Sequence, residues 1–89
     1  METLESLREK IDKIDADIIK KLAMRQTISK KIGHLKSASG KNIRDPAREQ
    51  AQKKHYEKLC VLYELDFTLV DFLFSKIIAH SRNLQKNEF

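Results

Sequence analysis

The first 36 residues of this 89-residue chain contain one glycine and no proline, and their apolar residues recur every three or four positions. This spacing gives an α-helix one apolar face, and nothing before Gly33 interrupts it. The sequence therefore predicts one long helix over about residues 2–37. The apolar face consists of Leu4, Leu7, Ile11, Ile14, Ile18, Leu22, Ile28, Ile32 and Leu35.

The predicted helix is too long for one small domain to cover. About 35 helical residues span roughly 52 Å, whereas a compact globule of 89 residues is roughly 30 Å across. The helices that follow are shorter, so much of the apolar face would lie beyond them. We expect a second copy of the chain to cover it, in an intertwined homodimer with two-fold symmetry.

Two shorter helices follow a loop that the sequence predicts over residues 37–42, where Gly40 and Asn42 suit a positive φ. Asp45 and Pro46 resemble an N-cap and a first helical residue, which predicts a helix over about residues 45–63. Asp66 can cap a third helix over about residues 66–87. The chain is thus expected to form a single all-α domain over residues 1–89.

Composition excludes several classes of protein. Two glycines and one proline argue against a turn-rich β fold and leave no glycine-rich phosphate loop. Cys60 is the only cysteine, and His34, His55 and His80 lack the spacing of metal ligands, so we expect neither a disulfide nor a metal. No signal peptide or membrane span is expected, and the predicted compartment is the cytoplasm. The net charge of +5 favours an anionic partner.

Three cations lie on the apolar face of the first helix. Steps of three and four residues along it pass Arg8, Arg25 and Lys36 at positions where isoleucine or leucine would pack better. Either these side chains extend to water from the edges of the face, or they are buried and need an anion. Arg25 and Lys36 are about 16 Å apart along the helix, close enough to converge on one small molecule. Arg8 lies about 25 Å from Arg25, so it would have to serve such a site from the other subunit.

Polar residues also mark the two shorter helices. Arg48 and Glu49 lie in the first turn of the second helix, beside free backbone N–H groups that favour an anion or a hydroxyl oxygen. Taken alone, these residues are better explained by a helix cap with a surface ion pair. In the third helix, Ser81 and Gln85 continue an apolar row, where buried polar groups need partners.

Together these residues resemble the all-helical (type II) chorismate mutase family. The resemblance covers nearly the whole chain and is carried by several short motifs in family-like order. They are the LREKID opening at residues 7–12, Arg25, Lys36, the pairs Arg44-Asp45 and Arg48-Glu49, and the pair Ser81/Gln85. The resemblance implies a homodimer with two sites, each completed by the partner's long helix. It implies the Claisen rearrangement of chorismate to prephenate, on the branch toward phenylalanine and tyrosine, with no cofactor.

The family pattern also implies catalytic roles. Arg8 of one subunit and Arg25 of the other would hold the two substrate carboxylates, with Ser81 assisting. Lys36 and Gln85 would hydrogen-bond the ether oxygen, where negative charge develops. Such a reaction needs a bound conformer and donors aimed at that charge, and it needs no nucleophile, base or metal.

The remaining implied contacts come from the second helix. Glu49 and the backbone at Asp45 would bind the ring hydroxyl, and Arg48 would add positive charge against the substrate.

Other functions fit parts of the same pattern. An isochorismate-pyruvate lyase or an amino-deoxychorismate mutase would share the fold and much of the cationic site. A basic helical dimer that binds nucleic acid would want its cations on one exposed face, and a non-catalytic coiled-coil adaptor would leave the inward cations and Gln85 without a role. We therefore expect a small dicarboxylate as the partner, and neither nucleic acid nor a membrane.

Overall fold

Three α-helices make up the computed structural model, which describes the backbone of residues 1–40 and 45–87 and the side chains of these residues up to 85. Helix α1 spans Leu4–Ser39, α2 spans Pro46–Tyr63 and α3 spans Phe67–Asn87. The predicted all-α fold of one long and two shorter helices is confirmed. Arg44, one of the motif residues, lies outside the described residues. So does Asn42, which is expected to take a positive φ in the loop.

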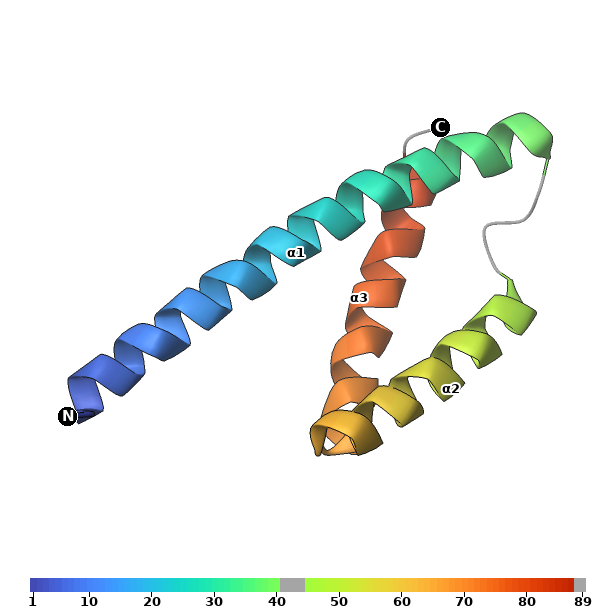
Figure 1. Ribbon diagram of the computed structural model, residues 1–89. Helices are drawn as coiled ribbons and strands as arrows, with labels where there is room; N and C mark the ends of the chain where they lie inside the picture. Colours follow the sequence, from blue (N-terminus) through green and yellow to red (C-terminus); the bar gives the residue numbers. More distant parts are fainter. Residues whose placement is uncertain (41–44, 88–89) are drawn as a thin grey trace.

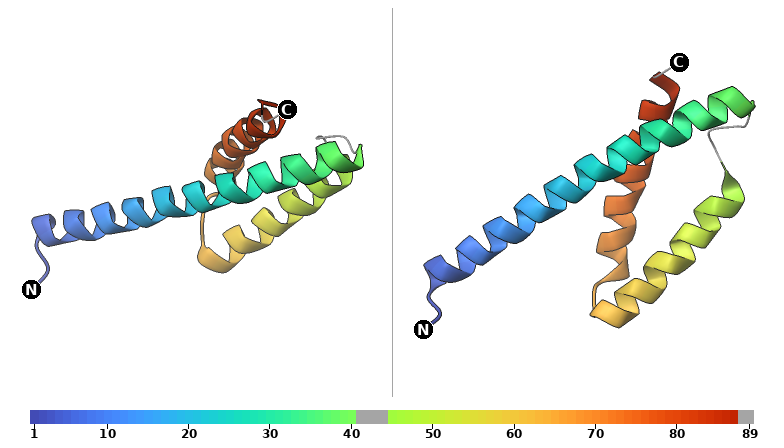
Figure 2. Two further views of the ribbon diagram at one scale, coloured as in Figure 1. Left: turned by 90° about the horizontal axis from the view of Figure 1, so that it is seen from above. Right: turned by 45° about the horizontal axis from the view of Figure 1, so that its top comes forward.

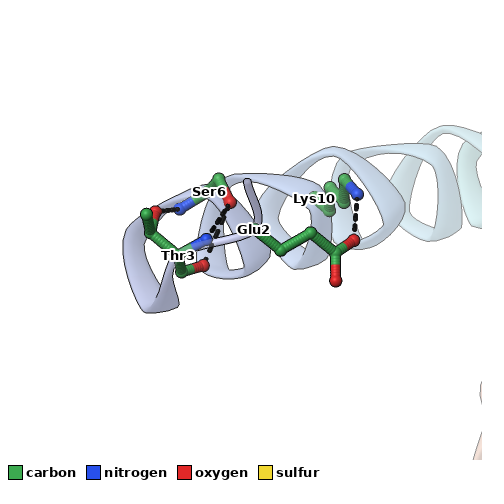
Figure 3. Close-up of polar contacts among 4 residues, drawn as sticks. All are labelled: Glu2, Thr3, Ser6 and Lys10. Atoms are coloured by element: carbon green, nitrogen blue, oxygen red, sulfur yellow. Dashed lines mark hydrogen bonds and ion pairs between the residues drawn. The ribbon is translucent and has the colours of Figure 1, made fainter.

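A capping box fixes the start of α1 (Figure 3). The Thr3 hydroxyl accepts a hydrogen bond from the Ser6 backbone N–H at 3.0 Å, and the Ser6 hydroxyl accepts one from the Thr3 N–H at 2.9 Å. These bonds satisfy two donors that a helix start leaves without partners. Lys10 and Glu2 form an exposed ion pair in the same turns, at 2.8 Å.

The end of α1 corrects the predicted loop. Residues 37–39 are helical, and the helix ends at Gly40, which has φ of 71°. The Gly40 N–H donates to the carbonyls of Lys36 and Ser37, and the Ser39 hydroxyl donates to the Leu35 carbonyl at 2.8 Å. The Ser39 hydroxyl thus finds its partner within the helix, and glycine supplies the left-handed residue that ends the helix.

The shorter helices begin where their capping residues predict. The Asp45 carboxylate accepts from the Arg48 N–H at 3.1 Å, with Pro46 in the first turn of α2. Asp66 accepts from the Thr68 N–H at 2.9 Å at the start of α3. Between these helices Glu64 takes a left-handed conformation with φ of 55°, which turns the chain back on itself.

The three helices form an open arrangement (Figures 1 and 2). Helix α3 packs against both the C-terminal half of α1 and against α2, while the described parts of α1 and α2 do not approach each other. The N-terminal half of α1 extends beyond the other helices, so the chain measures 57 × 26 × 15 Å. Among the described residues, none of the helices is long and apolar enough to cross a membrane.

Little apolar surface is buried within the chain. In the described part, Cys60 is the only buried apolar side chain, whereas the buried polar side chains are Ser29, Ser81 and Gln85. The apolar face of α1 stays exposed along its N-terminal half, from Leu4 at 65% to Ile18 at 53%. A single chain thus leaves uncovered the face that the sequence predicts for a partner.

Candidate active site

A cavity of about 470 Å³ lies between α1 and α2 and is bounded by α3. Seven of the eight predicted site residues line it, from all three helices. The residues around it are Arg25, Ile28, Ser29, Ile32, Lys36, Asp45, Arg48, Glu49, Gln52, His55, Tyr56, Ile78, Ser81, Arg82 and Gln85.

Helix α1 contributes one face to this cavity. Arg25, Ser29, Ile32 and Lys36 follow one another at steps of four, three and four residues, which aligns their side chains. Arg25 and Lys36 are both half-buried. The Arg25 guanidinium donates a hydrogen bond to the Ser81 hydroxyl, which in turn donates to the Ile77 carbonyl at 3.0 Å. Ser81 therefore fixes the position of one predicted carboxylate ligand.

Helix α3 approaches α1 closely at Gly33. A Cβ atom at this position would lie 3.0 Å from the Gln85 Cα and 3.1 Å from its Cβ. Real Cβ atoms rarely approach other atoms so closely, so any larger residue would push the two helices apart. Gly33 therefore allows Gln85 to reach the cavity wall.

The Gln85 amide is almost fully enclosed, with 8% of the residue exposed. Its Nε2 donates to the Ser29 hydroxyl at 3.1 Å, and its Oε1 has no hydrogen-bond partner among the described residues. A hydroxyl both donates and accepts, and the two amide atoms occupy nearly the same volume. The Ser29 hydroxyl itself donates to the Ser81 carbonyl at 3.4 Å. If that proton turned to the amide instead, a half-turn of the amide would let Oε1 accept from Ser29 and place Nε2 as a donor to a ligand.

The first turn of α2 forms the opposite side of the cavity. Asp45 caps this turn, and its carbonyl accepts from the Glu49 N–H at 3.0 Å. The Glu49 carboxylate accepts from Nη2 of Arg82 on α3 at 2.6 Å. This ion pair is partly buried, with 29% of the Glu49 side chain and 35% of the Arg82 side chain exposed.

The cavity lining is cationic overall. Arg25, Lys36, Arg48 and Arg82 contribute four positive charges, against the two carboxylates of Asp45 and Glu49. Isoleucines and Tyr56 supply apolar surface beside these charges. Arginine suits planar carboxylates, and lysine suits a single oxygen that gains charge. A small organic dianion with an apolar ring matches this lining.

Arg8 is the predicted site residue that this cavity lacks. It is exposed on the N-terminal half of α1, 17 residues before Arg25 and therefore about 25 Å away along the axis. The N-terminal half of α1 extends away from the other two helices (Figure 1). Among the described residues, no group of three or more His, Cys, Asp or Glu side chains could hold a metal ion.

Sequence reasoning missed several lining residues. Ser29 lies on the same helical face as Arg25 and Lys36, so its spacing could have identified it. Arg82 directly follows Ser81, but its partner Glu49 is 33 residues away and no local pattern joins them. Three further missed side chains, Gln52, His55 and Tyr56, follow Glu49 along α2 at helical spacing.

Residues 7–86 match the family described as chorismate mutase type II. A chorismate mutase of Methanocaldococcus jannaschii is 35% identical over 86 residues, which cover 97% of this chain and 87% of that protein. A bifunctional chorismate mutase/prephenate dehydratase of Aquifex aeolicus is 42% identical over 50 residues, or 56% of this chain and 14% of that protein.

Proposed function

This chain belongs to the type II chorismate mutase family, and from that premise we propose that its cavity converts chorismate to prephenate. The conversion is an isomerisation within one molecule: the ether C–O bond breaks while a new C–C bond forms, so no group enters or leaves. One observation carries the proposal. The cavity gathers Arg25, Lys36 and Gln85, residues distant in sequence, around a space that suits a small dianion.

Substrate binding is assigned to the arginines. Arg25 would hold one carboxylate, and Ser81, which already accepts a hydrogen bond from Arg25, would assist it. Arg8 of the partner chain would hold the second carboxylate. Holding both carboxylates selects the compact conformer in which the two reacting carbons approach each other, and this lowers the entropic part of the barrier.

Rate acceleration is assigned to Lys36 and Gln85. Negative charge builds on the ether oxygen as the C–O bond breaks, and donors placed there stabilise the transition state more than the ground state. Lys36 carries a positive charge, and the Gln85 amide would donate through Nε2 once Oε1 accepts from Ser29. Because an amide stays neutral across the usual pH range, this donor would need no acid to work.

The N-terminus of α2 would bind the ring hydroxyl. The Glu49 carboxylate would accept the hydroxyl proton in a hydrogen bond, the Asp45 backbone would contribute a second contact, and Arg48 would add positive charge. Glu49 and Arg48 already lie in the capped first turn that borders the cavity, which supports these roles.

The working unit in this proposal is a homodimer of single-domain chains, with two equivalent sites. The apolar side chains of α1 that α3 leaves uncovered, such as Ile11 at 56% and Ile14 at 57% exposure, support a partner helix there. One chain alone would supply only one of the two proposed carboxylate ligands. A two-fold arrangement would bring the second, the partner's Arg8, to the cavity.

The test is to incubate purified protein with chorismate and to identify the product by chromatography and mass. We expect prephenate, with the same mass as the substrate. Failure to consume chorismate would contradict the proposal. A parallel incubation with isochorismate tests the alternative lyase activity, which would release pyruvate.

A further inference from the structure

The ion pair between Arg82 and Glu49 joins α2 to α3. Arg82 lies on α3, one residue after Ser81, and Glu49 lies in the first turn of α2. The bond length of 2.6 Å and the partial burial of both side chains indicate a charge-assisted hydrogen bond. Its position at the cavity wall distinguishes it from the exposed pair of Lys10 and Glu2.

The first turn of α2 is positioned in part through α3. The described parts of α1 and α2 do not approach each other, so α2 is placed through its packing on α3. That packing includes the tilted rings of Tyr56 and Phe74, whose centroids are 4.3 Å apart, at the middle of α2. Closer to the N-terminus of α2, Arg82 of α3 contacts Glu49.

An arginine suits this task better than a lysine would. Its guanidinium stays charged at every accessible pH and presents several donors in one fixed plane. It can therefore hold a carboxylate oxygen in one direction. Loss of a hydrogen bond to a charged group costs enough to change an affinity about tenfold.

We infer that Arg82 is a positioning residue for the reaction: it holds the Glu49 carboxylate, and with it the first turn of α2, toward the cavity. This inference deepens the proposed function and rests on it, because Glu49 is assigned to the substrate hydroxyl. Arg82 acts through Glu49 and needs no contact with substrate. Nothing in the sequence motif identifies it, because the two partners belong to different helices.

The kinetic test compares Arg82→Met, Arg82→Lys, Glu49→Ala and the double variant Glu49→Ala/Arg82→Met. Lys58→Met, at an exposed position of α2, is the matched control for loss of one positive charge. We expect Arg82→Met to raise KM for chorismate about tenfold with a smaller effect on kcat, and Arg82→Lys to recover part of the loss. The double variant should be no worse than Glu49→Ala alone. Independent, multiplying effects would overturn the inference.

A second readout follows backbone order in place of activity. Amide hydrogen exchange over residues 50–56 should become several-fold faster in Arg82→Met and in Glu49→Ala, and should stay at the wild-type rate in Lys58→Met. Unchanged exchange in Arg82→Met would overturn the inference even if activity fell. If the wild-type protein left chorismate intact, the proposed function would fail, and the exchange rates would still decide whether Arg82 positions α2.

Discussion

The two halves of α1 form one continuous helix but differ in the size and exposure of the side chains on their packing faces. The N-terminal half carries large apolar side chains, and they are exposed: Leu4, Ile11 and Ile14 at 65%, 56% and 57%. The C-terminal half places Ser29 and Gly33 against α3, and these are buried. Where α1 packs on α3, small residues bring it close to Gln85. Where α1 contacts no other helix in the described part of the chain, its sequence carries isoleucine and leucine.

This difference separates two functions along one helix. Large apolar residues gain most from being removed from water, which suits association with a second chain. Small and polar residues gain little from burial, so their presence at the contact with α3 needs another reason. The cavity supplies it, because Ser29 and Gly33 hold the Gln85 side chain in place.

The largest effect on activity is expected from the two arginines, one on each half of α1, that are proposed to bind the same substrate. Arg8→Ala and Arg25→Ala should each lower kcat/KM about a thousandfold, because each removes a charged ligand of a carboxylate. An equimolar mixture that exchanges subunits should regain activity at about a quarter of its sites, since a heterodimer has one site with both arginines. Absence of recovery, with exchange verified by mass spectrometry, would mean that Arg8 acts within its own chain or not at all.

A charge on the N-terminal half tests its role in association. Ile14→Asp should prevent dimer formation, because it places a carboxylate in the face that the proposed partner would bury. Activity should fall about as far as in Arg8→Ala, because the partner's Arg8 would be lost from the site. Sedimentation or light scattering measures the mass, and Lys13→Asp, at the neighbouring exposed position, serves as the control. A monomer with full activity would refute the intertwined arrangement.

A methyl group on the C-terminal half tests the close approach. Alanine is normally about 1 kcal/mol better than glycine within a helix. Gly33→Ala should instead destabilise the fold by about 2 kcal/mol, because its Cβ would meet the Gln85 backbone. It should also lower kcat about tenfold by displacing the Gln85 amide. Denaturant unfolding and kinetics measure both, with Lys31→Ala as the exposed control on α1. A more stable variant would show that α3 can move without cost.

The smallest effect is expected at Ser29, whose hydroxyl orients the Gln85 amide. Ser29→Ala should lower kcat several-fold with little change in KM, because the amide loses its fixed direction and keeps its place. Ser29→Thr, which retains a hydroxyl, distinguishes the hydrogen bond from the volume of the side chain. Wild-type kinetics in Ser29→Ala would mean that Gln85 needs no orienting partner.

The sequence predicts the helices well because their ends are encoded locally. Asp45, Pro46, Asp66 and Gly40 act on backbone groups within a few residues, so their effects can be anticipated without a fold. Ser39 is the instructive exception: a serine at the end of a helix can either begin a loop or bond back to the preceding turn, and here it bonds back to Leu35.

The site was predictable only where spacing on one helix or the family resemblance carried it. Arg25 and Lys36 share a face of α1, and the structure brings them to one cavity with Ser81 and Gln85. The approach of Gly33 to Gln85 depends on how two helices cross, which no spacing within either helix encodes. Arg82, and its pairing with Glu49, could not be predicted for the same reason.

The unbroken course of α1 between Arg8 and Arg25 also limits how this protein can change length. Inserting one residue there would turn everything before it by about 100° and move it by about 1.5 Å. If one helix serves two sites, that single insertion would misplace an arginine in both at once. The segment should therefore tolerate many exchanges of exposed side chains and no insertion or deletion, so its length is under stricter selection than its composition.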